Sequence, residues 1–422
     1  MAQMPAFPVC AIVGGGMITQ VQILPSIYQL QRQGLLGEIR ISALNGAPLK
    51  VLAEDPTLRD AFPGQSFTPF PDFRKVDLEE KFPDLFETVL ASLPERNLVV
   101  VALPDQLHYR AIKKALEAGQ HVMTVKPLVL RYAQAVELEE LARAKGLFVG
   151  VEYHKRFDDR ALLARKEYRR GNFGEFRLAQ ATMIEPYYYR HSNFQNWCTV
   201  ENSDMFTYVG CHYVDQVAFI TGLLPVEVSV YGIVDEYPNG NQGYLWTDGR
   251  VIWENGASLS ILDAIGYPNA APGGNAQHLK MFCQGDRDAC LLAHDDQFRG
   301  VKYSFNTQGA SEGEDKFYHE PSPDYFKLLY RGGKGLEPVG YGFRSIEAVV
   351  RAAARVNAAG ASLAARRAAI EEIDREGVIA TPANSSYNEL VIEAGRLSIR
   401  NRGRAVEIVY GKTPGVRFKP YA

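Results

Sequence analysis

The first 150 residues alternate short apolar runs with segments whose apolar residues recur at helical spacing. The first run, residues 8–13, is closed by three glycines at 14–16, and a helical pattern follows. Further strands are expected at 38–46, 97–104, 121–127 and from residue 147, with helices at 105–118 and 131–146. Strands that alternate with helices predict an α/β fold, an N-terminal Rossmann doubly wound parallel sheet over residues 1–150.

The pattern changes after His154, where helices become rarer and strand-like runs follow one another with turn residues between them. We expect residues 151–342 to form a substrate-binding α+β domain with a large, mostly antiparallel open sheet. Residues 343–375 are rich in Ala and Arg at helical spacing and predict a separate helical segment. The tail, 376–422, is expected to contain a hairpin (NELVIEAGRLSIRNRGRAVEIVYG) and to pack as an arm on a neighbouring subunit.

Composition narrows the class of protein. The 422 residues carry 46 Lys and Arg against 49 Asp and Glu, too small an excess of either sign for a protein that neutralises phosphates along a nucleic acid. Five cysteines are odd in number and widely spaced, which favours neither a disulfide framework nor a zinc site and suits a reducing compartment. Without a basic leader or a long apolar run, we expect a cytoplasmic protein that does not bind membranes.

The glycine-rich turn is a candidate dinucleotide site. Gly14 and Gly16 occupy the first two glycine positions of GxGxxG, Met17 and Ile18 lead into the helix, and Thr19 stands at the third position. Such a turn brings backbone N–H groups to a pyrophosphate, although a glycine triplet alone also suits a plain tight turn. At the end of the second strand, Asn45 replaces the usual acid, so NAD is favoured only slightly and NADP stays open.

An ordered set of motifs resembles the Gfo/Idh/MocA family, that of glucose-fructose oxidoreductase and inositol dehydrogenase. The set covers about residues 8–350 and consists of AIVGGGMIT, VVVALPDQLHYRAIKKALEAGQHVMTVKPL, GVEYHKRFD, GNFGEFR and GCHYVDQVAFITG. The resemblance implies a nicotinamide-dependent oxidation or reduction of a sugar or cyclitol hydroxyl. It also implies a homo-oligomer, a dimer or tetramer, because the open sheet of relatives often forms the subunit interface.

Two motifs of the family carry over with departures. Its Glu-Lys-Pro becomes Val125, Lys126 and Pro127, which keeps the lysine and loses the glutamate; the resemblance implies a cis bond at Pro127. Its helix motif Asp-x-x-x-His-x-x-Asp keeps His212 and Asp215 and has Tyr208 in place of the first aspartate. The resemblance thus implies Lys126 and His212 as catalytic residues and leaves the usual proton relay in doubt.

Alcohol oxidation needs a base that takes the hydroxyl proton as hydride leaves. We interpret His212 as the principal acid/base, Lys126 as the group that orients the hydroxyl, and Tyr208 as a relay. Spacing of i, i+4 and i+7 predicts that Tyr208, His212 and Asp215 share one face of one helix. The alternatives are a buried structural histidine, a core tyrosine and a solvated lysine at a strand end.

The remaining candidates flank the cofactor and the substrate. Pro104 and His108 match family positions near the cofactor, as do Lys126 and Pro127. The expected substrate-binding residues follow the last Rossmann strand, come from an aromatic segment that suits sugar C–H faces, or belong to the helix motif, and they are His154, Arg156, Tyr189, Trp197 and Asp215. Salt-bridge formation, helix packing and core packing are the alternative roles of these side chains.

Three functions fit these observations. The first is an NAD(P)-dependent oxidoreductase acting on a secondary hydroxyl of a sugar, cyclitol or glycoside. The second keeps the cofactor bound and recycles it, so that oxidation, elimination and reduction cleave a glycoside. The third is a non-catalytic dinucleotide-binding regulator. Metal and acyl-transfer mechanisms are unsupported, because the sequence has no metal-ligand spacing and no nucleophile elbow.

Overall fold

The computed structural model describes residues 6–271, 275–286, 288–297, 300–306, 316–319 and 325–420. The chain divides into two compact units. Unit 1 comprises Met1–Leu128, Ala133–His154 and Phe326–Asn384. Unit 2 comprises Val129–Tyr132, Lys155–Tyr325 and Ser385–Ala422. The units are therefore built from interleaved stretches of the chain, which differs from the linear division expected from the sequence.

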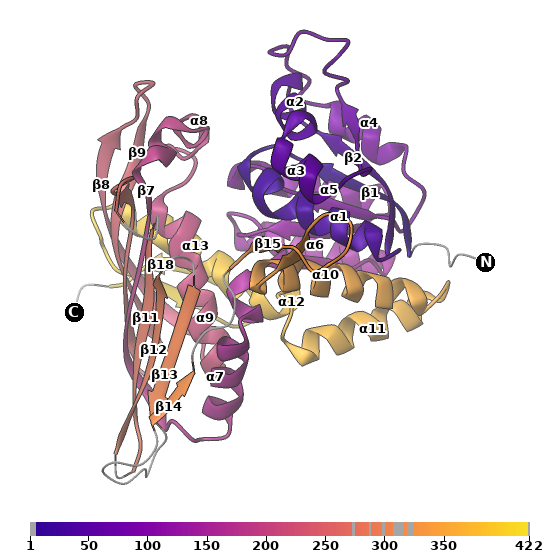
Figure 1. The fold of residues 1–422 in the computed structure, drawn as a ribbon. Helices are drawn as coiled ribbons and strands as arrows, with labels where there is room; N and C mark the ends of the chain where they lie inside the picture. Colours follow the sequence, from indigo (N-terminus) through magenta and orange to yellow (C-terminus); the bar gives the residue numbers. More distant parts are fainter. Residues whose placement is uncertain are drawn as a thin grey trace. The chain divides into compact units, whose positions relative to one another are not determined.

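Unit 1 contains the predicted Rossmann sheet, six parallel strands in the order β3-β2-β1-β4-β5-β6 (Figure 1). Its strands are β1 (Phe7–Val13), β2 (Leu36–Ser42), β3 (Thr68–Phe70), β4 (Leu98–Val101), β5 (His121–Val125) and β6 (Val149–Glu152). Its helices include α1 (Leu24–Arg32), α2 (Gly46–Glu54), α3 (Pro56–Ala61), α4 (Leu85–Ala91), α5 (His108–Glu117) and α6 (Tyr132–Lys145). Strand β3 was not predicted, because it is only three residues long and contains Pro69.

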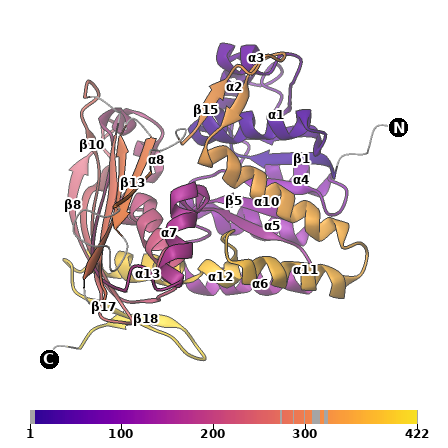
Figure 2. The same cartoon turned by 60° about the horizontal axis from the view of Figure 1, so that its bottom comes forward.

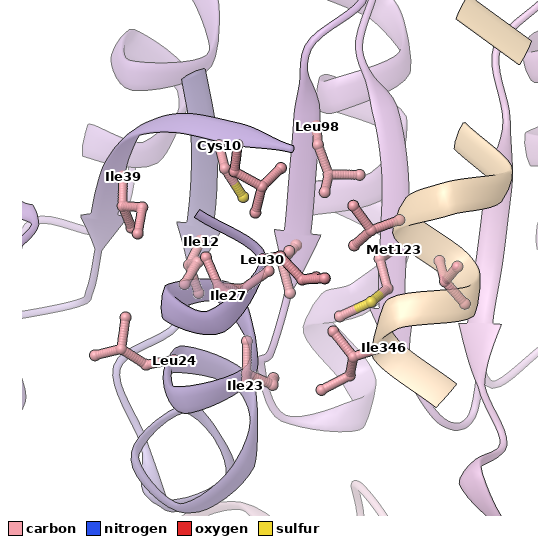
Figure 3. Close-up of a cluster of buried hydrophobic side chains, with 14 of the residues drawn as sticks. Cys10, Ile12, Ile23, Leu24, Ile27, Leu30, Ile39, Leu98, Met123 and Ile346 are labelled. Carbon is pink, nitrogen blue, oxygen red and sulfur yellow. The ribbon is translucent and has the colours of Figure 1, made fainter. Parts of the chain in front are cut away.

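The helical segment expected at 343–375 belongs to the Rossmann core. Helix α10 (Tyr341–Ala358) contacts α1, β5 and β6, and α11 (Leu363–Glu376) packs beside it (Figure 2). Figure 3 shows Ile346 of α10 beside Met123 of β5, within the same cluster as Ile12 and Leu98. The expectation of a separate segment was wrong, because periodicity reveals an apolar face but not the surface that the face covers.

Unit 2 contains the large open sheet, ten strands in the order β14-β13-β12-β11-β7-β10-β9-β8-β17-β18. The long central strands are β7 (Glu175–Pro186), β8 (Pro225–Glu236), β9 (Gln242–Trp253), β10 (Ser258–Tyr267), β11 (Ala276–Gln284), β12 (Ala289–Gln297) and β13 (Gly300–Asn306), with β14 (Lys316–His319) at one edge. Among these ladders only β7–β10 is parallel, which confirms the mostly antiparallel sheet. Helices α7 (Asp159–Arg169), α9 (Cys211–Thr221) and α13 (Tyr387–Ile399) lie along one face (Figure 1).

The C-terminal tail differs from its prediction. The first half of the expected hairpin is helix α13, and the hairpin is formed by β17 (Val406–Val409) and β18 (Gly415–Phe418). Helix α13 packs on β8, where Gly395 allows close approach to the Phe206 ring. Its buried residues, which include Leu390, Val391 and Ala394, follow helical rather than alternating spacing. This packing corrects the expected intersubunit arm, because α13 covers the sheet of its own chain.

A buried histidine makes the stability of unit 1 depend on pH. The Phe148 N–H donates to His121 Nδ1 at 2.9 Å, and His121 Nε2 donates to Asn357 Oδ1 at 2.9 Å, which fixes a neutral tautomer. Burial lowers the pKa of His121 to about 4. The unfolded chain binds this proton near pH 6.5, so the stabilising contribution is complete above that pH and is lost as pH falls towards 4, by up to about 3 kcal/mol.

We therefore expect the free energy of unfolding, measured with urea, to decrease between pH 7 and pH 4.5. In the His121→Gln variant this component of the pH dependence should be absent. An unfolding free energy whose pH dependence is the same in the variant as in the wild type would contradict the assignment.

Candidate active site

The turn after β1 requires glycine at its first position. Gly14 has φ of +117°, and a Cβ there would lie 2.0 Å from the carbonyl oxygen of Ala102. The Gly14 N–H donates to the Ser42 carbonyl at 2.7 Å, and the buried Thr19 hydroxyl donates to the Gly14 carbonyl at 2.8 Å. Thr19 therefore holds the turn closed, which explains how it takes the place of the third glycine.

The space next to Gly16 is open. No heavy atom lies within 4 Å of a Cβ built on Gly16, among the residues that the structure describes. The chain then enters a short π-helical turn (Thr19–Ile23) that leads into α1, and its first turn carries no acidic residue. An empty approach to backbone N–H groups at the positive end of a helix fits the pyrophosphate of a dinucleotide. The exposed Met17 forms the rim of this turn, and the partly buried Ile18 leads into the helix.

Asn45 follows β2 and precedes α2, with an extended backbone. Its side chain is half-buried, and its amide Nδ2 lies 3.4 Å from Glu79 Oε2. The structure thus places an amide and a carboxylate together at the strand end where dinucleotide-binding sheets hold the adenosine ribose.

His108 is fully buried and positions backbone. Its Nδ1 lies 2.7 Å from the Pro127 carbonyl oxygen and its Nε2 lies 2.8 Å from the Leu103 carbonyl oxygen. Both ring nitrogens therefore lie against backbone carbonyl oxygens, which favours the packing role of His108 over contact with the cofactor. The imidazole ties the turn at Leu103 and Pro104 to Pro127, so it fixes the segment that carries Lys126. The Lys126–Pro127 peptide bond is cis, as the resemblance implies.

A buried carboxylate at the end of β6 holds His154. Glu152 Oε1 accepts from Gln22 Nε2 at 2.9 Å and from Ser345 Oγ at 2.5 Å, while Oε2 lies 3.2 Å from His154 Nδ1. The His154 ring also stacks on Tyr341, with centroids 5.7 Å apart.

Unit 1 brings Lys126 and His154 to the same edge of its sheet. Val125 pairs with Glu152 in the parallel ladder, so Lys126 and His154 leave neighbouring strand ends. These carboxyl ends are where sheets of this kind bind ligands. Sequence reasoning missed Glu152, although a charged residue that closes the apolar run VGVE was a usable signal.

The segment of unit 2 that carries Tyr208, His212 and Asp215 is not one continuous α-helix. Residues Phe206–Gly210 form a π-helical turn, and α9 begins only at Cys211. The wider turn shifts Tyr208 relative to His212, so the expected single α-helical face does not extend to Tyr208. The Tyr208 ring packs edge-on against Phe194, at 4.9 Å between centroids, and against Trp197, at 5.5 Å. His212 lies in the first turn of α9 and is buried.

Arg156 and Asp215 form a buried ion pair. The Arg156 guanidinium reaches Asp215 through Nε at 2.8 Å and Nη2 at 2.5 Å, and both side chains are 2% exposed. The Tyr387 hydroxyl and the Asn388 amide donate to Asp215 Oδ1, at 3.0 and 2.9 Å. Burial, followed by the charge of Asp215, raises the pKa of Tyr387 well above its usual value. This geometry favours a structural role for the pair, which anchors α13 beside α9, over direct contact with substrate.

The aromatic segment of unit 2 has a buried and an exposed part. Tyr189 is buried and stacks on Phe194, with centroids 5.3 Å apart and planes at 9°, and Phe194 contacts Trp197. Tyr187 and Tyr188 are exposed. Tyr189 therefore supports the cluster, while the exposed rings and the half-buried Trp197 can face a ligand.

Comparison with known proteins agrees with the Rossmann fold of the N-terminal part of the chain. Residues 9–153 match the model of an oxidoreductase family with an NAD-binding Rossmann fold, Gfo/Idh/MocA, which confirms the resemblance over this part of the chain. An uncharacterized oxidoreductase of Schizosaccharomyces pombe is 34% identical over 129 residues, which are 30% of this chain and 34% of that protein. The D-glucoside 3-dehydrogenase of Escherichia coli is 28% identical over 33% of this chain and 39% of its own length. The chain thus spans about a third of the length of the curated relatives it matches.

The fold as a whole is also known. An inositol dehydrogenase homolog from Azotobacter vinelandii, solved with NAD⁺, superposes with a TM-score of 0.63 at 19% identity. The match covers 96% of this chain and 98% of that one. At this identity the likeness establishes the fold alone, including the second unit that the family model leaves unmatched.

Two further features bear on the class of site. Within the ranges that the structure describes, no three His, Cys, Asp or Glu side chains are grouped as a metal site. In the same ranges, no helix has the length and apolar character to cross a membrane.

Proposed function

We propose that this chain, whose residues 9–153 belong to the Gfo/Idh/MocA oxidoreductase family, is an NAD(P)-dependent dehydrogenase. It transfers hydride between the nicotinamide and a secondary hydroxyl or ketone of a sugar, cyclitol or glycoside. The observation that carries the proposal is the turn at Gly14–Gly16, closed by Thr19 and open beside Gly16. The names of an E. coli glucoside dehydrogenase and an inositol dehydrogenase homolog support this substrate class.

The chain supplies binding, orientation and proton transfer, while the bound nicotinamide supplies the hydride chemistry. Backbone N–H groups at Gly16 and Met17 would bind the pyrophosphate, and Pro104 and Pro127 would border the cofactor. Lys126 orients the substrate hydroxyl through its ammonium group. His212 takes the hydroxyl proton as hydride leaves, and Tyr208 relays it. His154, held by Glu152, contributes a further hydrogen bond at the substrate end of unit 1.

The aromatic segment suits a carbohydrate. The exposed Tyr187 and Tyr188 rings, next to the cluster built on Tyr189, offer apolar faces on which sugar C–H groups can pack. Arg156 and Asp215 act as positioning residues, because their polar atoms are paired with each other.

The test begins with the purified protein. Its ultraviolet spectrum shows whether a nicotinamide dinucleotide copurifies, and incubation with excess NAD or NADP and a panel of sugars, cyclitols and glycosides shows whether reduced cofactor accumulates. Accumulation is the expected result. Release of a sugar from a glycoside without net reduction would support the cofactor-recycling glycosidase instead. Tightly held dinucleotide with neither reaction would indicate a binding regulator.

We also propose that a second copy covers the outer face of the unit 2 sheet. The ladder registers place Tyr231, Ile233, Trp246 and Leu262 on the face opposite α9 and α13, and all four side chains are exposed. Large exposed apolar patches of this kind usually mark an interface. We expect sedimentation to give the mass of a dimer or tetramer, and a monomer mass at micromolar concentration would contradict the proposal.

The buried cysteines support a reducing, cytoplasmic location. All five are buried and are not joined in disulfides, and burial raises the pKa of Cys10 to about 12. Cys283 and Cys290 lie opposite each other in the β11–β12 ladder as thiols. Recovery of the native protein in a secreted fraction would contradict this location.

A further inference from the structure

Residues 72–82 are fixed against the turn that follows β2. The Ala47 N–H donates to the Leu78 carbonyl at 3.1 Å, and the Phe82 N–H donates to the Leu44 carbonyl at 2.7 Å. A Cβ on Gly46 would lie 3.2 Å from the Leu78 side chain, so glycine there permits close packing. These contacts lie on either side of Asn45 in one segment and of Glu79 in the other, and they hold the two residues side by side.

Glu79 directs its carboxylate to Asn45. The Asn45 Nδ2 lies 3.4 Å from Glu79 Oε2, and the Glu79 N–H donates to Asp77 Oδ1 at 2.8 Å, which orders the turn that presents the side chain. Asn45 itself stands where enzymes of this fold commonly have the acid that binds the ribose hydroxyls. The strand end lacks that carboxylate, and residue 79 brings one to the same place from a different segment.

We infer that Glu79 selects NAD against NADP, an inference that rests on the proposed function. A carboxylate can accept a hydrogen bond from the free 2′-hydroxyl of NAD, whereas the 2′-phosphate of NADP would place a second negative charge next to it. The Asn45 amide can donate to the same hydroxyl, so amide and carboxylate together form an acceptor and donor pair for the ribose.

The cations of the segment do not offset this charge at Asn45. Arg74 and Lys75 both pair with Asp72, at 2.7 and 3.3 Å, and the Arg74 guanidinium holds the pKa of Asp72 well below its usual range. Lys81 is the remaining cation of residues 72–82. If Lys81 captured the 2′-phosphate instead, the wild type would bind NADP at least as tightly as NAD, which the experiment below tests directly.

The adjacent Glu80 provides a matched control. Glu79→Gln and Glu80→Gln remove the same charge from exposed neighbouring positions, but only Glu79 contacts Asn45. Neither substitution is expected to change the thermal midpoint, because both side chains are on the surface. The two substitutions remove a charge of the same sign and size. A difference between the variants therefore reports the effect of the position of that charge.

The experiment is calorimetric titration of the full chain and both variants with NAD⁺ and NADP⁺. We expect the wild type to bind NAD⁺ at least about tenfold more tightly, and Glu79→Gln to gain about tenfold for NADP⁺ and lose a few-fold for NAD⁺, which are effects of roughly one close charge interaction. Glu80→Gln should change neither affinity by more than about twofold. A higher salt concentration should reduce the ratio of the NAD⁺ affinity to the NADP⁺ affinity of the wild type, because salt screens the repulsion between charges.

Equal effects of the two substitutions, or a wild type that binds NADP⁺ as well as NAD⁺, would overturn the inference and leave the proposed function intact. A wild type that binds neither dinucleotide would overturn the proposed function, and this inference with it.

Discussion

Turnover by the His212→Asn variant is expected to fall by about 10²- to 10⁴-fold, because the hydroxyl proton then has no positioned base as hydride leaves. Lys126→Met should lower kcat by a similar factor, since it removes the ammonium group that orients the reacting oxygen. The measurement is kcat at saturating substrate, with the sugar or cyclitol found in the panel. Dinucleotide affinity of the His212 variant should stay near that of the wild type, because His212 belongs to unit 2.

A lysine outside the candidate site is the control. Lys114→Met changes a partly exposed lysine on α5 and should retain kcat within about twofold. Circular dichroism of the three variants separates loss of catalysis from loss of fold. Near-normal kcat in both His212→Asn and Lys126→Met would remove the proposed roles, whereas a loss in only one would assign the proton transfer to that residue.

The sequence predicted the elements whose apolar pattern depends only on their own residues. The buried parallel strand β4 reads as an unbroken apolar run, and α5 follows the 3.6-residue period with a buried face. The three-residue β3 was missed because its pairing with β2, rather than its composition, makes it a strand. The tail was misjudged for a related reason, since the consecutive apolar residues 390–392 suit a buried strand as well as a buried helix, and only the packing of α13 on β8 decides between them.

In the candidate site, too, features set by local residues were predicted and features that depend on distant partners were not. Gly14 and the cis bond at Pro127 follow from motifs, because each is a backbone requirement written into one or two residues. The roles of His108 and Arg156 did not follow, since both depend on partners 19 and 59 positions away in the chain. Glu79 escaped notice because an exposed carboxylate becomes informative only when its hydrogen-bond partner is known, whereas Glu152 left one signal, its place at the end of an apolar run. Long-range polar contacts are thus the part of this site that periodicity cannot supply.

Substitution of the two outer glycines of the turn by alanine should have different effects, on stability at Gly14 and on dinucleotide binding at Gly16. In Gly14→Ala, the new methyl group would lie 2.0 Å from the Ala102 carbonyl oxygen on a backbone with φ of +117°. The turn or the end of β4 must move, so we expect the free energy of unfolding to fall by about 3 kcal/mol or more. Urea denaturation of the full chain, followed by far-ultraviolet circular dichroism, measures the loss.

Gly16→Ala should leave stability within about 0.5 kcal/mol of the wild type, because no described atom lies within 4 Å of the added Cβ. The methyl group would instead occupy the space of the pyrophosphate and weaken dinucleotide binding by about 2 kcal/mol, roughly thirtyfold in Kd. Calorimetry with NAD⁺ measures the change. Unchanged affinity in a stable Gly16→Ala protein would show that the open space is not the pyrophosphate site, and the proposed function would lose the observation that carries it.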